Sequence, residues 1–304
     1  MKLHDTQITN YLTFCKSQKC LDVKTIRAYK IDLTHFASTM PAETSLYDIA
    51  SRQIESYIAH LHSIYKPKTA KRKIASLKAF FHYCEFYEFI ERNPFDKIQI
   101  RFREPVILPK TIPLQTLELF LSTIYNQRQL TTTSYQQKNA LRDAAVIELL
   151  FATGIRISEL CSLKSCDVNL NDNFVLIYGK GSKERKLQIG NDNVLKTLNE
   201  YKNTFSKEIE NCGHFFANQS GKPLSDQSVR RMIQKYASLA GIDQHITPHM
   251  FRHTFASSLL DADVDIRYIQ EMLGHSSITT TQIYTHVTLA KQKMILTTKH
   301  PRNG

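Results

Sequence analysis

The hydrophobic residues of the first hundred positions recur every three to four residues, which is the period of a helix with one buried face. Four stretches show this period: 5–17, from Asp22 or Thr25 up to Pro41, 51–63 and 69–89. Pro41 ends the second stretch, and an Asn-Pro pair at 93–94 closes the block. The pattern therefore predicts an all-helical first domain over residues 1–100.

A proline-rich segment follows this helical block. Residues 98–113 contain three prolines and show no helical period. We therefore expect residues 101–112 to form an extended linker and residues 113–304 to form a second domain.

The second domain shows helical periodicity on both sides of a strand-like region. FVLIY (174–178) and KLQI (186–189) are short apolar runs joined by a glycine-rich turn, which indicates an antiparallel hairpin. The Gln- and Thr-rich residues 126–138 are expected to form a loop. Helices are expected at 114–125, 139–153, 158–163, 192–205, 225–240, from 247 onward and at 265–273. The predicted fold class is mainly α with a small antiparallel β-sheet, in two domains.

The chain carries 40 Lys and Arg against 28 Asp and Glu, which is a formal net charge of +12 at pH 7. Both halves share the excess, since residues 1–110 contain 18 basic and 11 acidic residues and the rest contain 22 and 17. This charge favours a protein that binds a polyanionic partner, most often nucleic acid. The alternative is a basic protein without a polyanionic partner. Both domains could contact the same long ligand.

Composition disfavours several other classes of protein. No apolar run approaches the roughly 20 residues that cross a bilayer, and the first residues lack the apolar core of a signal peptide. We therefore expect a cytoplasmic protein without membrane contact, whose six cysteines are reduced thiols. Two cysteine pairs share a five-residue offset, whereas zinc-binding pairs normally stand about two to four residues apart. We expect no metal and no other cofactor.

A cluster of basic residues begins the fourth helical stretch: Lys68, Lys71, Arg72 and Lys73. Cations are not favoured at a helix N-terminus, so this cluster does not serve helix stability. It is either a solvated face or a face that contacts DNA phosphates. Arg230 and Arg231, near the beginning of another helical stretch, allow the same two interpretations.

The segment 247–286 concentrates residues that suit phosphate chemistry. Thr247 and Pro248 are typical of a helix start, in which a capping hydroxyl precedes a proline at the first helical position. His249 and Arg252 are three residues apart, so they share one face of that helix.

Other polar residues stand where predicted elements end. His275 directly follows Gly274, which is expected to end a helix, and Tyr284 comes nine residues after His275. Upstream, Arg156 follows a glycine that ends an apolar helix, and Lys180 lies in the glycine-rich turn of the hairpin.

These residue types together can transfer a phosphoryl group. Two arginines can each form paired hydrogen bonds to the non-bridging oxygens of a phosphate. A lysine can protonate a leaving alkoxide, and a tyrosine can attack phosphorus when nearby cations favour its phenolate. The alternative is a zinc site at His249 and His253, which are spaced as in HExxH, but the arginine between them would repel the metal.

Four segments resemble the tyrosine recombinases, also called the phage-integrase family, and within it the Xer-like site-specific recombinases. They are ATGIRISEL (152–160), YGKGSKERKLQI (178–189), TPHMFRHTFAS (247–257) and LGHSSITTTQIYTH (273–286). The first domain resembles the SAM-like, helical core-binding domain of that family, through TIRAYKIDLTHF, the basic helix and the Asn-Pro ending. The resemblance covers nearly the whole chain.

The resemblance implies that the residues cut and rejoin DNA strands. Arg156 and Arg252 would clamp the scissile phosphate, and Glu159, one turn beyond Arg156, would orient that arginine. Lys180 would protonate the leaving 5′ oxygen, although Lys183 competes for this role. Taken alone, Arg156 is better explained as a surface residue that pairs with Glu159 than as a catalytic residue, and the set as a whole reverses that preference.

The remaining implied roles belong to two histidines and a tyrosine. His249 would assist proton transfer, and His275 would donate a hydrogen bond to the phosphate. Tyr284 would attack, which leaves a 3′-phosphotyrosyl link and a free 5′ hydroxyl without metal or ATP. Tyr268 and His253 are the rivals for these roles, and packing in the core is the alternative for each.

The resemblance also implies the partners: duplex DNA with inverted-repeat core sites, clamped between the two domains. Four protomers would assemble on two sites, as a homo-tetramer or as a hetero-tetramer with a related recombinase, with residues 289–296 packing on a neighbour. Resolution of DNA dimers, inversion, and integration of a mobile element all remain open. A DNA-binding protein with an unused catalytic set and a type IB topoisomerase are the alternatives from other classes.

Overall fold

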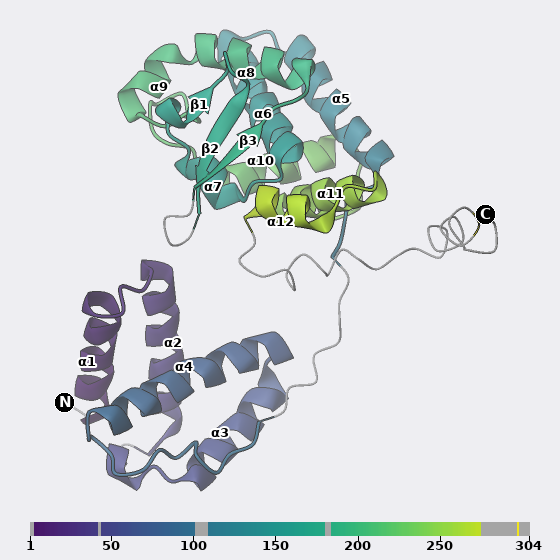
Figure 1. The fold of residues 1–304 in the computed structure, drawn as a ribbon. Coiled ribbons are helices and arrows are strands. Elements are labelled where there is room, and N and C mark those ends of the chain that lie inside the picture. Colours follow the sequence, from purple (N-terminus) through teal and green to yellow (C-terminus); the bar gives the residue numbers. More distant parts are fainter. Residues whose placement is uncertain (1–2, 42–43, 101–108, 180–183, 275–296, 298–304) are drawn as a thin grey trace. The chain divides into compact units, whose positions relative to one another are not determined.

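The structure, a computed structural model, describes residues 3–41, 44–100, 109–179, 184–274 and 297. The chain forms two compact units, Met1–Val106 and Ile107–Gly304 (Figure 1). Within the described residues, no helix is both long enough and apolar enough to cross a membrane.

The first unit is helical, as the hydrophobic period predicts. Its described elements are α1 (Leu3–Ser17), α2 (Val23–Thr39), the single-turn 3₁₀ helix η1 (Leu46–Asp48), α3 (Ser51–Ile64) and α4 (Pro67–Phe86). The carboxylate of Asp22 accepts a hydrogen bond from the main-chain N–H of Lys24 at 2.7 Å and so caps α2. The helices bury one shared core of aromatic and aliphatic side chains, which includes Tyr11, Leu33, Leu61 and Phe81.

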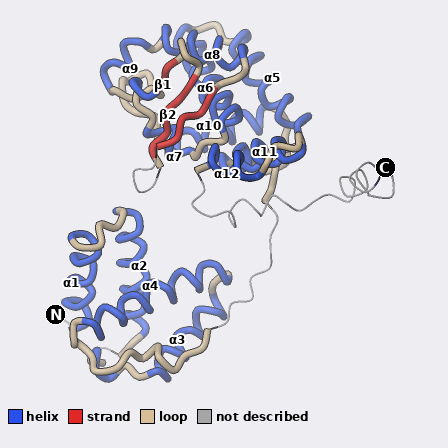
Figure 2. Tube along the Cα trace, viewed as in Figure 1, coloured by secondary structure: helices blue, strands red, loops and turns tan. Residues whose placement is uncertain are grey.

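The second unit is a helical domain that contains one small sheet (Figure 2). Its described helices are α5 (Leu114–Leu130), α6 (Ser134–Thr153), α7 (Ile157–Ser162), η2 (Ser165–Asp167), α8 (Asp192–Thr204), α9 (Ser206–Cys212), α10 (Asp226–Leu239), α11 (Pro248–Asp261) and α12 (Ile266–Leu273). The strands are β1 (Val168–Asn169), β2 (Phe174–Tyr178) and β3 (Glu184–Gln188). A mainly α fold with a small antiparallel sheet is thereby confirmed.

The sheet has the order β1-β2-β3, and both pairs are antiparallel. In the hairpin, Val175 lies opposite Leu187, and Ile177 lies opposite Arg185. Val175, Ile177 and Leu187 are buried. β1 has only two residues, which is too short for an alternating pattern to reveal it.

Helix α6 is the buried centre of the second unit. Helices α5, α8 and α11 all pack against it. Its nearly continuous apolar sequence predicts burial on several faces, and the structure confirms this. The side chains that solvent cannot reach are Ala144, Ala145, Val146, Ile147, Leu149 and Leu150.

The prediction that residues 126–138 form a loop is wrong. Helix α5 continues to Leu130, α6 begins at Ser134, and Thr133 caps α6 by accepting a hydrogen bond from the main-chain N–H of Gln136 at 3.3 Å. Glutamine is a good helix former, and Arg128 is ion-paired with Glu200 on α8. Tertiary contacts of this kind extend a helix through a polar sequence that has no apolar period.

The end of the proline-rich segment is anchored to the second unit. Ile112 is buried, and its main-chain N–H donates to Thr254 Oγ1 on α11 at 2.8 Å. The side-chain amide of Gln244 donates to the carbonyl of Thr111 at 3.0 Å. Residues 111–112, at the end of the stretch expected to be a linker, therefore pack as part of this unit.

Candidate active site

Gly154 ends α6 in the left-handed conformation, with φ of 60°. A Cβ atom at this position would come within 2.5 Å of Phe255 Cδ1 on α11, so only glycine fits both the conformation and the space. The chain turns sharply here, and Arg156 becomes the residue that precedes the first turn of α7. The break predicted at Gly154 thus places Arg156 at a helix beginning beside α11.

Glu159 lies in the first turn of α7 with its carboxylate buried. It accepts hydrogen bonds from the main-chain N–H of Arg156 and from Arg156 Nη1, each at 2.8 Å. Burial by itself would raise the pKa of Glu159, but hydrogen bonds from Arg185 and from the Arg156 main chain, with the charges of both arginines, bring that pKa below its usual value. Glu159 is therefore ionised at neutral pH.

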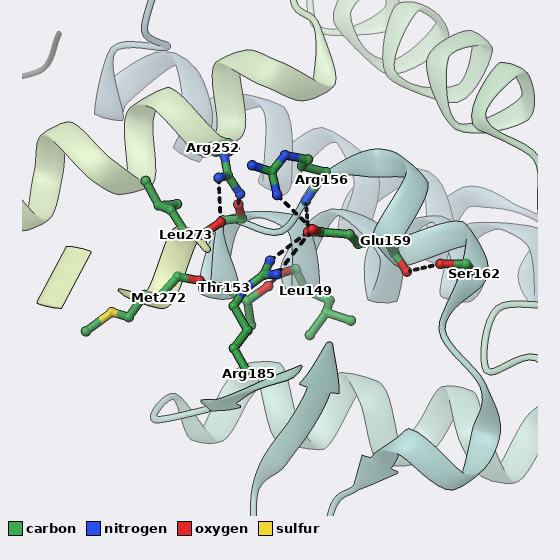
Figure 3. Close-up of polar contacts among 10 residues, drawn as sticks. Leu149, Thr153, Arg156, Glu159, Ser162, Arg185, Arg252, Met272 and Leu273 are labelled. Atoms are coloured by element: carbon green, nitrogen blue, oxygen red, sulfur yellow. Dashed lines mark hydrogen bonds and ion pairs between the residues drawn. The ribbon is translucent and has the colours of Figure 1, made fainter. Parts of the chain in front are cut away.

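Arg185, on β3, binds the same carboxylate from the other side. Its Nη2 donates to Glu159 Oε2 at 2.7 Å, and its Nη1 donates to Oε1 at 3.2 Å. Its Nε donates to the main-chain carbonyl of Met272, near the end of α12, at 2.9 Å. Figure 3 shows Glu159 between the two guanidinium groups of Arg156 and Arg185.

Arg252 is buried on α11, with 4% of its surface exposed. Its Nη1 donates to the carbonyl of Gly154 at 2.8 Å. Its Nη2 donates to the carbonyl of Leu273 at 2.6 Å (Figure 3). A buried cation needs such partners. Arg252 therefore joins the end of α6, two residues before Arg156, to the end of α12.

Two histidines lie on the same helix as Arg252. His249, in the first turn of α11, is exposed. His253 is partly buried, and burial, followed by the charges of His249 and Arg252, lowers the pKa of His253 to about 4. His253 is therefore neutral at pH 7. The prediction that the Thr247 hydroxyl caps α11 is wrong. In this helix, which the structure describes, the Thr247 side chain makes no capping hydrogen bond, and of the two predicted start signals only Pro248 at the first helical position is present.

Gly274 ends α12 in the left-handed conformation, with φ of 63°, as predicted. Of the six expected catalytic residues, the structure describes Arg156, His249 and Arg252. Lys180, His275 and Tyr284 lie outside the described residues.

The cluster expected to contact DNA from α4 divides into exposed and buried residues. Lys68 and Lys71 are exposed, whereas Arg72 is half-exposed and ion-paired with Asp32 of α2. Lys73 is only 5% exposed, and its Nζ lies 3.3 Å from Asp32 Oδ1. The structure therefore corrects the expectation for Lys73, because α4 turns this residue inward, where it joins α4 to α2.

The second expected DNA-contacting pair lies on α10. Arg230 and Arg231 are both exposed near the beginning of this helix. Their neighbours Val229, Met232 and Ile233 are buried, so α10 points one face to the core and keeps both arginines on the other. Among the described residues, no three His, Cys, Asp or Glu side chains gather into a group that could hold a metal ion.

Arg185 is not among the site residues that the sequence predicts. It stands two residues before buried Leu187 on β3, so both side chains point to the same face of the strand. Because arginine is rarely buried unless it is paired, an arginine at an inward-facing position of a strand indicates a buried carboxylate nearby. The alternation alone could have identified Arg185, although it could not have identified Glu159 as the partner.

Comparisons with known proteins agree with this geometry. The chain matches the Phage integrase family over residues 124–291, and the Phage integrase N-terminal SAM-like domain over residues 8–85. It is 67% identical to a tyrosine recombinase of Agathobacter rectalis over 98% of this chain and 97% of that protein. It is 35% identical to the tyrosine recombinase XerD of Listeria innocua over 97% of this chain and 98% of that protein.

A solved structure shares the fold. The XerH site-specific recombinase bound to its difH substrate, in a pre-cleavage complex, superimposes with a TM-score of 0.71 at 24% identity, over 93% of this chain and 83% of that one. This likeness supports the fold, while the family follows from the sequence matches over both units. The chain belongs to the phage integrase family and is an enzyme of the tyrosine recombinase type.

Proposed function

We propose that this enzyme cuts and rejoins DNA strands through a 3′-phosphotyrosyl intermediate formed by Tyr284. Arg156 and Arg252 hold the non-bridging oxygens of the scissile phosphate, and Lys180 protonates the 5′ oxygen as it leaves. The phosphodiester bond is exchanged for a tyrosyl ester, so a free 5′ hydroxyl can reverse the step. Neither ATP nor a metal ion is then needed for the energy of the bond.

Two histidines complete the proposed set. His249 assists the transfer of the proton from the attacking tyrosine, and His275 donates a hydrogen bond to the phosphate. The exposed position of His249 at the beginning of α11 supports this role, because a proton acceptor has to reach the reacting group.

The observation that carries the proposal is the convergence of Arg156 and Arg252 at the end of α6. Arg252 donates to Gly154, which is two residues from Arg156, and Glu159 fixes Arg156 through two hydrogen bonds. Guanidinium groups that are held before the ligand arrives stabilise the charge of a phosphoryl transition state without reorganisation. With Arg185 included, the cluster contains three guanidinium groups and one carboxylate, that of Glu159. Its net charge is therefore positive, which favours the binding of an anion.

The test is covalent attachment to DNA, which needs a duplex site selected from random sequence by binding to the protein. One strand of that duplex is nicked inside the site, so that the short fragment with the 5′ hydroxyl diffuses away and cannot reverse the step. We expect the wild type to form a protein–DNA adduct that survives denaturation and the Tyr284→Phe variant to form none. A wild type without an adduct would favour the alternative of a DNA-binding protein with an unused catalytic set. Relaxation of supercoils without a specific site would favour a type IB topoisomerase.

For the biological setting we propose a Xer-like enzyme that resolves DNA dimers or inverts a segment, acting on inverted-repeat core sites. The full-length similarity to XerD at 35% identity supports this setting. Four protomers would assemble on two sites, as a homo-tetramer or with a related recombinase. Integration of a mobile element is the competing setting. Inverted repeats or mobile-element genes in the DNA that flanks the gene would decide between them.

We also propose that the first domain ends near residue 100 and that Lys68, Lys71, Arg72, Arg230 and Arg231 contact DNA phosphates. Exposure of the two lysines and of both α10 arginines supports these contacts. We further propose that the protein is located in the cytoplasm, because an enzyme of this family acts on DNA.

A further inference from the structure

Arg185 uses every nitrogen of its guanidinium group in the interior of the second unit. The side chain is 9% exposed. Nη1 and Nη2 grip both oxygens of the Glu159 carboxylate, while Nε binds the carbonyl of Met272. A guanidinium fork has the geometry for this double grip on a carboxylate, and an ammonium does not. One side chain on β3 thus binds α7 and the end of α12 at the same time.

Each group that Arg185 contacts, or the peptide next to it, is hydrogen-bonded to one of the two arginines proposed to clamp the phosphate. Glu159, which Arg185 grips, also accepts two hydrogen bonds from Arg156. Met272, whose carbonyl Arg185 binds, is followed by Leu273, whose carbonyl accepts from Arg252. Arg185 touches neither clamping arginine in these hydrogen bonds, yet it holds a partner of one and the neighbouring peptide of the other.

The packing around Gly274 shows how closely Arg185 fits. A Cβ atom at Gly274 would come within 2.9 Å of Arg185 Nη1 and within 3.2 Å of its Cζ and Cδ. The end of α12 therefore rests directly on this side chain. A shorter residue at 185 would leave a gap under α12 and a buried Glu159 with fewer partners, and both changes would let the two arginines drift apart.

We propose that Arg185 is a positioning residue of the recombination reaction, which fixes Glu159 and the end of α12 and thereby sets the spacing of Arg156 and Arg252 on the scissile phosphate. This inference rests on the proposed function. A displacement of about 1 Å at a reacting centre can cost roughly 100-fold in rate. The effect of losing Arg185 should therefore appear in the chemical step more than in DNA binding.

The experiment measures single-turnover adduct formation at saturating protein, with the Kd for the same DNA measured separately. We expect Arg185→Gln to slow adduct formation by roughly 100-fold, with a change in Kd of less than about threefold. Arg185→Lys should recover only part of the rate, because it restores the charge without the fork. The matched control is Arg142→Gln, which removes another largely buried arginine paired with a carboxylate, Asp143, outside this cluster.

The control separates positioning from stability. A merely structural role predicts a lower Tm and a normal rate per folded molecule for both Arg185→Gln and Arg142→Gln. The proposal is overturned if folded Arg185→Gln forms adduct within about threefold of the wild-type rate, or if Arg142→Gln loses as much rate. If Arg185→Gln does not fold, Arg185→Lys decides: slower adduct formation with normal Kd supports the proposal, and the wild-type rate refutes it. Failure of the proposed function itself would show as a wild type that forms no adduct.

Discussion

Glu159 holds Arg156 at two points, through the main-chain N–H and through Nη1, each at 2.8 Å. The same carboxylate therefore fixes both the start of α7 and the direction of the guanidinium. This double contact makes Arg156 part of a rigid element, whereas a flexible surface arginine would lose side-chain entropy each time it bound a phosphate.

We expect Glu159→Gln to slow adduct formation by roughly 10- to 100-fold while DNA affinity stays near normal, because the amide cannot bind both arginines as an ion. The change should also alter the response of stability to pH. The pKa of Glu159 is held below its usual value in the fold, so its ionised form stabilises the native state above the ordinary glutamate pKa of about 4.3, and this contribution is lost as the pH falls further.

Chemical denaturation between pH 3 and 7 would measure this second effect. The variant should lose less stability than the wild type in the acid part of the range. Glu118→Gln, at an exposed position of α5, is the matched control and should follow the wild type. Identical acid profiles for all three proteins would contradict the account.

His253 should make the fold sensitive to mild acid. Its folded pKa of about 4 lies below the ordinary histidine value of about 6.5, so the native state binds fewer protons than the unfolded state between those two values. Stability should therefore fall as the pH drops from about 6.5 to 4, by on the order of 1–2 kcal/mol after allowance for solvent screening. His253→Gln should flatten this part of the curve, as measured by urea unfolding. A wild-type curve that is flat over this interval would refute the prediction.

The buried pair of the first unit should respond asymmetrically to mutation. Asp32 binds Lys73, Arg72 and the hydroxyl of Ser76, whereas Lys73 has Asp32 and the face of the Tyr65 ring. Asp32→Ala should cost roughly 3–5 kcal/mol, because it leaves a cation buried without its counter-ion. Lys73→Met should cost clearly less, since Asp32 keeps two partners. Thermal unfolding of the full chain tests this, and an equal or larger loss for Lys73→Met would be the contrary result.

DNA binding should depend steeply on salt, and the exposed lysines of α4 should contribute to that slope. Lys68→Ala and Lys71→Ala should each weaken binding about equally across sequences and reduce the slope of log K against log salt by about one. Lys73→Met provides the control, because its ammonium is turned toward Asp32. An affinity that is flat across salt concentration, or an equal change of slope for the buried lysine, would count against the proposed contact face.

Most helices follow from local features of the sequence. The apolar run of α6, the glycine stops at Gly154 and Gly274 and the hairpin pattern all predict elements that the structure contains. These features report burial and backbone conformation, which are set by nearby residues. The helical ends around residues 126–138 do not follow in this way, because contacts such as Arg128 with Glu200 come from distant parts of the chain.

In the candidate site, too, contacts between residues close in the sequence can be predicted, whereas contacts between distant residues cannot. Glu159 as the partner of Arg156 is an i, i+3 relationship that the sequence predicts and the structure confirms. Lys73 lies beside Lys71 and Arg72 in the sequence, and both Arg72 and Lys73 pair with Asp32, but the rotation of α4 buries Lys73 alone of the three. Arg185 binds a residue 26 positions away and a carbonyl 87 positions away, and no spacing rule in the sequence connects those three places.

Tyr284 is the residue that we propose forms the covalent bond to DNA. The most direct test is to digest the adduct formed on a selected, end-labelled duplex and to sequence the labelled peptide until the modified residue is identified. We expect the label to be joined through the 3′ phosphate to Tyr284, with a free 5′ hydroxyl on the other strand end. A label on Tyr268, or a link through a 5′ phosphate, would be the contrary result.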